Sequence, residues 1–330
     1  MNKTWSEFMA SRHLAAAHTA PACALNDLSH FGLIRVEGED AEAFLQGQLT
    51  NDIRQVTESH SNLAGWCSAK GRMLANFRCF RRGDAYYLQT PRENLSVVIK
   101  RLGMFVLRAK VRIDDASDEL MRMGITGDCA EPLLAPFIES LPEEVNGVVH
   151  HQSLSLIRLP GATPRFEVLG QSETLIPLWQ TAESQAHPMD NGFWALQEIH
   201  AGIPTIYQRT SEVFVPQMAN MQLVDGVSFT KGCYVGQEVI ARMQYLGKLK
   251  RRMYLAHVET ETPPAPGDDL FAEGSTSGQG AGKVVDAQPQ GNGFDLLAVI
   301  EIASAEENEV TLGENGSRLA IEKLPYPFVE

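Results

Sequence analysis

KGCYVGQEVIARMQYLGKLKRR, residues 231–252, joins a turn, a cysteine, a helical pattern and a basic cluster in one short stretch. Four apolar residues recur in it at the spacing of a helix. They are Val235, Val239, Ile240 and Met243. Cys233 is expected just before or in the first turn, where unpaired N–H groups and the positive end of the helix dipole favour a thiolate. Lys231, two residues earlier, is expected to add to that effect.

Gly236 lies inside this helical pattern, where glycine costs up to about 1 kcal/mol relative to alanine. That cost predicts a packing or functional reason for the glycine. An ordinary structural interpretation of the stretch stands beside the functional one. A single cysteine is most often a small core residue, and a basic run is most often a solvated strand edge. The basic run here is Lys248, Lys250, Arg251 and Arg252.

The chain has 330 residues and a formal net charge of −13, with ordinary hydrophobic and charged fractions. This length allows two or three domains with a sizeable core. The negative balance disfavours a general nucleic-acid binder, because contacts with phosphates supply most non-specific affinity. Any RNA contact would therefore have to be local.

Five scattered cysteines, without a C-x-x-C pair, do not predict a disulfide framework in a chain of this size. A reducing, cytoplasmic location fits them best. The first 21 residues lack the apolar core of a signal peptide, and no run of 18 apolar residues predicts a membrane span. Zinc-hydrolase and serine-hydrolase motifs are missing, so no metal site is predicted.

Taken in order, the chain alternates strand and helix patterns, and its character changes at Met253. Mixed strand–helix–strand units predict α+β domains of split βαβ type. Residues 106–113 alternate apolar and basic side chains, which predicts a half-buried strand. From Met253 onward, short strands separated by Pro-, Gly- and Ser-rich loops predict a small β-barrel. The glycine-rich segment 273–282 lacks phosphate-loop spacing and is interpreted as a hairpin loop.

Two aromatic residues are candidates for binding a flat ligand. Trp194 falls in the first turn of a helix that Asp190 is expected to cap, and Phe31 begins a strand. Taken singly, each is most often a core residue. As a pair they would suit a heteroaromatic ligand such as a pterin, since offset stacking contributes about 0.5–1.5 kcal/mol beyond burial.

The motif K-G-C-Y-x-G-Q-E resembles the signature of the YgfZ family, folate-binding proteins related to the aminomethyltransferase (T protein) of the glycine cleavage system. The matching residues are Lys231, Gly232, Cys233, Tyr234, Gly236, Gln237 and Glu238. The segments 44–53, 69–78, 194–204 and 324–327 also resemble the family. The similarity extends from about Leu33 to the C-terminus.

The resemblance implies an α+β fold of the aminomethyltransferase (GcvT) type. Two interleaved split βαβ (ferredoxin-like) domains and a C-terminal β-barrel are expected to form a ring around a channel that binds tetrahydrofolate. Residues 26–247 are then the folate-binding region and residues 248–330 the barrel. Residues 1–25 are expected to be a flexible arm, a loose or marginal helix, because chain termini are often poorly ordered.

The resemblance also implies a ligand site for tetrahydrofolate or a one-carbon derivative. Family members use two tryptophans there; Trp194 matches one, and Phe31 stands at the other without the indole donor. Relatives hold the pterin with a glutamate where this chain has His200, so Glu198 is expected to substitute for it.

True aminomethyltransferases carry an acidic pair, with an aspartate that acts at the reacting amine, where this chain has Ala75 and Asn76. Neither side chain can accept a proton or carry negative charge. A conventional transferase is therefore not expected.

By the same resemblance, the protein is expected to support iron–sulfur enzyme maintenance and cluster assembly, and thereby tRNA modification by thiolation. Cys233 would be the reactive thiol, supported by Lys231, Tyr234, Gln237 and Glu238. Iron–sulfur proteins or tRNA-modifying enzymes are the expected partners of a cytoplasmic monomer, without strong direct RNA binding. Two alternatives stay open: a folate-dependent aminomethyl or demethylating transferase, and a non-catalytic scaffold whose aromatic residues are core.

Overall fold

The computed structural model describes residues 2–16, 21–273, 275, 280–307 and 309–328. The chain divides into two compact units whose segments alternate along the sequence. The first unit consists of Met1–Gly47, Asp52–Asn62 and Phe77–Trp194. The second consists of Gln48–Asn51, Leu63–Asn76 and Ala195–Glu330.

The first unit contains a six-stranded sheet with the strand order β11-β1-β7-β10-β9-β8. Its strands are β1 (Cys23–Asp27), β7 (Met121–Gly127), β8 (Val148–His151), β9 (Leu154–Arg158), β10 (Arg165–Gly170) and β11 (His187–Met189). The central strands β7 and β10 are antiparallel, with Phe166 opposite Ile125 and Glu167 opposite Gly124. Since neighbouring side chains in a strand point to opposite faces, Phe166 and Glu167 face opposite sides of this sheet.

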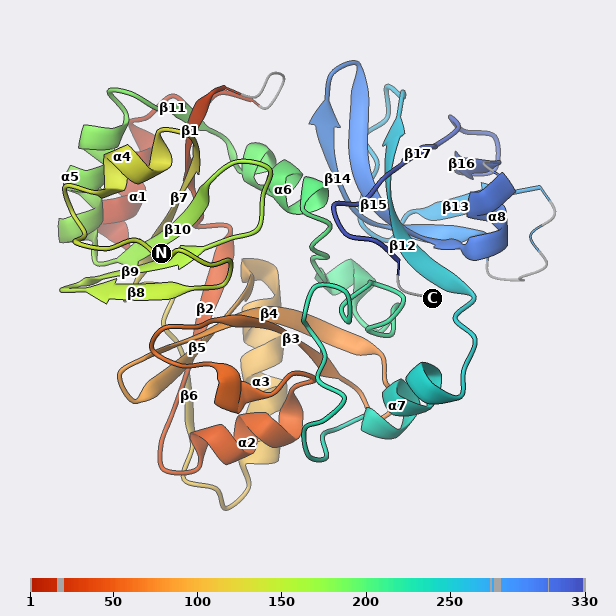
Figure 1. Ribbon diagram of the computed structural model, residues 1–330, viewed down its shortest axis with the longest axis horizontal. Helices are drawn as coiled ribbons and strands as arrows, with labels where there is room; N and C mark the ends of the chain where they lie inside the picture. Colours follow the sequence, from red (N-terminus) through yellow and green to blue (C-terminus); the bar gives the residue numbers. More distant parts are fainter. Residues whose placement is uncertain (1, 17–20, 274, 276–279, 308, 329–330) are drawn as a thin grey trace. The chain divides into compact units, whose positions relative to one another are not determined.

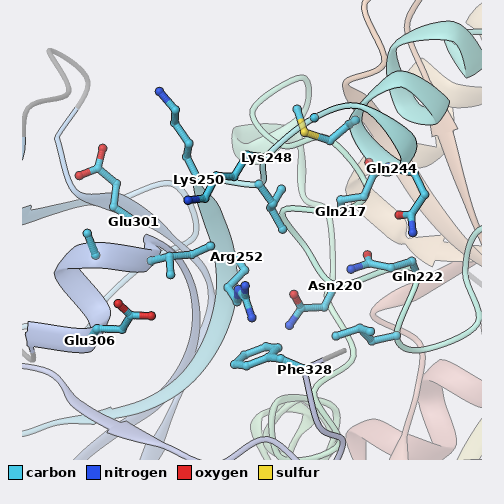
Figure 2. Close-up of a pocket in the computed structure, with 16 residues that line it drawn as sticks. Gln217, Asn220, Gln222, Gln244, Lys248, Lys250, Arg252, Glu301, Glu306 and Phe328 are labelled. Atoms are coloured by element: carbon cyan, nitrogen blue, oxygen red, sulfur yellow. The ribbon is translucent and has the colours of Figure 1, made fainter. Parts of the chain in front are cut away.

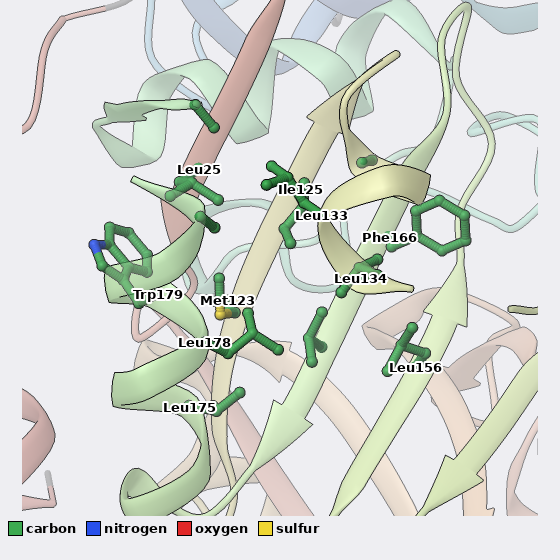
Figure 3. Packing of buried hydrophobic residues seen from close by; sticks show 14 of the residues in the cluster. Leu25, Met123, Ile125, Leu133, Leu134, Leu156, Phe166, Leu175, Leu178 and Trp179 are labelled. Carbon is green, nitrogen blue, oxygen red and sulfur yellow. The ribbon is translucent and has the colours of Figure 1, made fainter. Parts of the chain in front are cut away.

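The apolar face of this sheet packs against α1 (Lys3–Ala10), α4 (Ala130–Leu134) and α5 (Ser172–Ala182). Figure 3 shows Leu175 and Leu178 of α5 directed at Met123 of the sheet, and Trp179 and Leu25 belong to the same cluster. All five are almost fully buried. Each such side chain contributes about 1.5–3 kcal/mol by leaving water, so this face holds a main core of the unit.

The predicted N-terminal arm, residues 1–25, is partly wrong. Residues 3–10 form α1, and its Trp5 is only 1% exposed. The indole N–H of Trp5 donates a hydrogen bond of 2.9 Å to the carboxylate of Asp27. Burial of a large aromatic side chain with a satisfied polar group orders this helix, which the general tendency of termini could not predict. Residues 17–20 of the arm lie outside the described residues.

A second sheet has the strand order β3-β4-β5-β2-β6. These strands are β2 (Phe31–Glu37), β3 (Asn62–Cys67), β4 (Met73–Arg82), β5 (Ala85–Pro91) and β6 (Arg112–Asp115). The adjoining helices are α2 (Ala41–Gln48), α3 (Leu95–Val106) and the short 3₁₀ turns η1 (Ile53–Gln55) and η2 (Arg92–Asn94). The strand predicted over residues 106–113 is wrong for most of its length, because Leu107 has a φ of +48° and breaks the extended backbone.

The C-terminal part of the second unit is a curled antiparallel sheet with the order β16-β13-β14-β15-β12-β17 (Figure 1). Its strands are β12 (Arg251–Val258), β13 (Asp269–Ala272), β14 (Gly282–Gln290), β15 (Gly293–Glu301), β16 (Val310–Leu312) and β17 (Ala320–Glu322). The unit also contains η3 (Gln208–Thr210), α7 (Gln237–Tyr245) and α8 (Ile302–Glu307). Residues 274 and 276–279 of the predicted hairpin loop lie outside the described residues.

These elements confirm the predicted α+β class. The arrangement of the domains as a ring and the division at residue 247 stay predictions. Within the described part of the chain, no helix combines the length and apolar character needed to cross a membrane.

The cysteines differ from expectation in one respect. Cys23 and Cys129 form a disulfide that links β1 to the start of α4, with Cα atoms 5.8 Å apart. Cys67, Cys79 and Cys233 are free, and only Cys233 among these three is exposed. The scattered spacing could not show this pair, because the two residues are 106 positions apart and meet only in the folded sheet.

Candidate functional site

The motif loop around Cys233 is held by a buried residue on each side. Lys231 is 5% exposed, and its ammonium donates hydrogen bonds of 2.7 Å to the backbone oxygens of Leu49 and Asn51. It also lies 5.1 Å from the ring centre of Tyr234, which is 8% exposed. Such charge-assisted bonds are about twice as strong as neutral ones. The loop is therefore anchored immediately before and after Gly232 and Cys233.

Cys233 lies at the exposed point of this loop and forms no disulfide. It lies before the helix, further from the first turn than the sequence predicted. Helix α7 begins at Gln237, and Gly236 is the N-cap, so the thiol precedes the cap by three residues. The ammonium of Lys231 is directed to main-chain oxygens.

Close packing explains why residue 236 is a glycine, as its position in the helical pattern predicted. Its φ is +82°, and a Cβ atom there would lie 2.5 Å from the oxygen of Ser68 and 3.1 Å from the Cα of Gly71. Ser68 and Gly71 belong to the turn between β3 and β4. Only glycine allows both this backbone conformation and this close approach. The turn thus fixes the start of α7.

The remaining motif residues lie near the start of α7. Gln237 is the first residue of α7, and its N–H donates to the oxygen of Tyr234 at 3.2 Å. Glu238 is exposed in the first turn, where a carboxylate interacts favourably with the helix dipole. Burial raises the pKa of Tyr234 above its ordinary value, so its phenol stays protonated at neutral pH.

In the first unit, Trp194 is enclosed rather than open. It lies in α6 (Asn191–His200), which Asp190 caps by accepting the N–H of Phe193 at 3.2 Å. Trp194 is 1% exposed, and the guanidinium of Arg165 lies 4.6 Å from its ring centre. On the sheet, Gly124 leaves the room that the indole occupies, since a Cβ there would lie 2.1 Å from the ring. A ligand that stacks on Trp194 would first have to displace Arg165 or another neighbour.

Phe31 belongs to the same apolar cluster as Trp194 and is only partly buried. Its ring centre lies 4.2 Å from that of His30. The guanidinium of Arg122 donates a 2.8 Å hydrogen bond to the backbone oxygen of Phe31. Burial lowers the pKa of His30 to about 4, so this imidazole is neutral at pH 7.

Buried charges surround this aromatic pair, and sequence reasoning missed them. Arg122, Arg165 and Glu167 are at most 2% exposed. Gln89 donates to Glu167 at 3.1 Å. Burial lowers the pKa of Arg122 to about 10, while the nearby charge of Glu167 opposes that shift. The alternation of Arg165 and Glu167 with apolar residues in one strand was the available signal, since it places both on one face.

His200 and Glu198, the other predicted ligand residues, belong to the second unit. The Nε2 atom of His200 lies 2.7 Å from Asp295, and the Nδ1 atom of His257 lies 2.7 Å from the other oxygen of Asp295. Burial alone would raise the pKa of Asp295. The hydrogen bonds and charges of the two imidazoles lower this pKa by more, so it lies below the ordinary value. His200 is thus held by a carboxylate that sequence reasoning did not connect with it.

Glu198 is 8% exposed and lies near a second buried acid, Asp286. Asp286 accepts a 2.9 Å hydrogen bond from the hydroxyl of Tyr207. Burial raises the pKa of Asp286 to about 7, and the charge of Glu198 adds to the rise, although hydrogen bonds to Asp286 oppose it. This acid is therefore partly protonated at neutral pH.

Asn76, at the place of the transferase aspartate, has a structural role. Its Nδ2 donates to the oxygen of Pro204 at 2.7 Å, and its Oδ1 accepts the N–H of Ile206 at 2.9 Å. Both ends of the buried amide are thereby engaged with the backbone that follows α6. Ala75, beside it, is fully buried.

Comparisons with known proteins identify the fold and the family of this chain. Residues 2–157 match the family described as the GCVT N-terminal domain. The glycine cleavage system aminomethyltransferase T from Bartonella henselae has a similar structure, with a TM-score of 0.68 and 17% identity, over 98% of this chain and 89% of that one. This likeness shows the fold alone.

Two relatives in sequence carry the name tRNA-modifying protein YgfZ. The protein from Colwellia psychrerythraea is 33% identical over 97% of this chain and 98% of its own length. The protein from Klebsiella pneumoniae is 31% identical over 92% of each. Identity at this level over nearly the full length shows common descent, and the chain belongs to the YgfZ family.

Proposed function

We propose that this protein supports tRNA modification, as the name of its relatives indicates, and that it does so through the exposed thiol of Cys233. Membership of the YgfZ family supports the first part. The observation that carries the second is a free, exposed cysteine on a loop that two buried residues, Lys231 and Tyr234, hold in place. Exposure is a requirement for a reactive thiol, whereas a buried structural cysteine is inert.

The finer proposal is that the protein binds tetrahydrofolate or a one-carbon derivative and acts in the cytosol to maintain iron–sulfur enzymes, including those that thiolate tRNA. The aminomethyltransferase-type fold supports a folate site. Phe31 and Trp194 share one cluster, and the buried Arg165 and Glu167 provide hydrogen-bonding groups for a polar heterocycle. Glu198 and His200 are proposed as further ligand residues.

The transferase alternative lacks support from the site. Both polar atoms of the Asn76 amide are hydrogen-bonded to the backbone, and the side chain of Ala75 has no polar atom. Neither residue can therefore take the role of the aspartate in an aminomethyltransferase. The scaffold alternative predicts no folate binding and is decided by the titration below.

The test of the thiol is complementation of a strain that lacks this gene, with thiolated tRNA nucleosides as the readout. Cys233→Ser is expected to abolish complementation while leaving the unfolding temperature unchanged, because the side chain is exposed. Thr230→Ala, an exposed residue of the same loop, is the matched control and should complement fully. Full complementation by Cys233→Ser would exclude the role of the thiol.

The test of folate binding is calorimetric titration with tetrahydrofolate, together with tryptophan fluorescence. Trp194→Phe keeps an aromatic ring and should weaken both the binding heat and the quenching. The buried Trp66 and Trp179 serve as controls, since a phenylalanine at either position should leave the folate signal intact. Absence of binding heat and quenching in the parent protein would favour the scaffold alternative.

A further inference from the structure

A cavity of about 920 Å³ lies within the second unit, and its lining includes Lys248, Lys250 and Arg252 from the basic run of residues 231–252. Figure 2 shows the side-chain amides of Gln217, Asn220 and Gln222 on one side of it and the charged side chains of Lys250, Arg252, Glu301 and Glu306 on the other. The lining amides include Gln217, Asn220 and Gln222, and the lining cations are Lys248, Lys250 and Arg252. Its volume falls in the range of ordinary ligand sites.

The three cations have no carboxylate partner among the described residues. Arg252 instead stacks on Phe328, with its guanidinium carbon 4.5 Å from the ring centre, and its buried Nε–H lacks an acceptor within the described chain. Two carboxylates also line the cavity. Glu301 is bound to Arg251 at 3.1 Å, which leaves Glu306 to face three cations. An excess of unpaired positive charge on a protein with a net charge of −13 favours an anionic ligand.

The opposite wall presents hydrogen-bond acceptors. Gln217 and Asn220 are 2% and 1% exposed. Their NH₂ groups donate to the backbone oxygens of Ile240 at 2.7 Å and Met253 at 2.8 Å, which fixes the orientation of both amides. Their oxygens, and that of Gln222, have no partner in the part of the chain that the structure describes. A buried acceptor without a donor is unfavourable, so a ligand with N–H groups would stabilise this wall.

We propose that this cavity binds an acidic peptide segment of a partner protein. A glutamate-rich peptide offers one backbone N–H and one carboxylate per residue, which matches three acceptors on one wall and three cations on the other. Single-stranded RNA fits less well, because its phosphates carry no N–H groups for the three acceptors.

The test is fluorescence anisotropy of a fluorescein-labelled tetraglutamate peptide with the full-length protein. Saturable binding is expected, and a tetraglutamine peptide should not bind. Lys248→Gln and Lys250→Gln remove exposed cations and should each weaken binding about tenfold, since a hydrogen bond to a charged group is of that size. Lys100→Gln, an exposed lysine of α3 in the first unit, is the matched control and should bind as the parent does.

A second variant, Gln222→Leu, removes one acceptor and should weaken binding without lowering the unfolding temperature. The proposal would be overturned by equal binding of the two peptides, by equal loss in the Lys100→Gln control, or by no binding at all. Tighter binding of a labelled uridine decamer than of tetraglutamate would assign the cavity to RNA and also overturn it.

Discussion

The motif loop and the surroundings of Trp194 solve the same physical problem in different ways. Both bury a cation. Lys231 satisfies its ammonium with two neutral backbone oxygens and thereby presents an exposed thiol. Beside Trp194, Arg122 and Arg165 are buried together with an acid, Glu167. In the first region a buried cation holds a loop in place. In the second, buried cations and a buried acid lie together around a covered aromatic ring.

The largest effect should come from breaking the charge balance beside Trp194. Arg122→Met should lower the free energy of unfolding by about 4 kcal/mol, because it removes the charge near Glu167 as well as two hydrogen bonds. Denaturant unfolding measures this loss. The double variant Arg122→Met/Glu167→Gln should recover part of it; a double variant with the summed loss of the two single variants would show that the charges are not coupled.

A smaller loss is expected in the motif loop. Lys231→Met should lower the free energy of unfolding by about 3 kcal/mol, since two buried backbone oxygens lose their donor but no buried charge is left behind. The control is Lys248→Met, an exposed lysine that should change stability by less than about 0.5 kcal/mol. A loss as small as that of the control would mean that Lys231 does not anchor the loop.

Asp286 is a third buried ionisable group, and it differs from the two regions above. The unfavourable burial of its charge is relieved mainly by protonation rather than by an ion of opposite charge. Its pKa of about 7 in the folded protein lies above the ordinary value of 3.8. Folding therefore favours the protonated acid, and the stability that this contributes is lost as pH rises from about 4 through 7. Between pH 5 and pH 8, Asp286→Asn should gain about 2 kcal/mol relative to the parent in urea unfolding. Parallel pH profiles of the two proteins would contradict the raised pKa.

The sequence predicted those parts of the molecule that local patterns determine. The alternating strand and helix patterns and the cap at Asp190 follow from spacing and capping chemistry within a few residues. Gly236 was found in the same way, because a glycine in a helical pattern demands a reason. The C-terminal strands were predictable from their alternation and from the Pro- and Gly-rich loops between them.

What the sequence did not predict depends on contacts between distant residues. The start of α7 was placed too early, because the turn at Ser68 and Gly71 fixes the cap at Gly236. The helix around Trp5 was expected to be loose, yet Asp27 and the core order it. Likewise, the partner of His200 is Asp295, 95 residues away, and no local pattern connects the two.

The measurement that tests the central claim most directly is alkylation of the folded protein with iodoacetamide, followed by peptide mass mapping over time. We expect rapid modification of Cys233 alone, because Cys67 and Cys79 are buried and Cys23 is paired with Cys129. Cys233→Ser should then remain unmodified on the same timescale. Protection of Cys233, or modification of Cys67 or Cys79 at a similar rate, would contradict the assignment of an exposed thiol on an anchored loop.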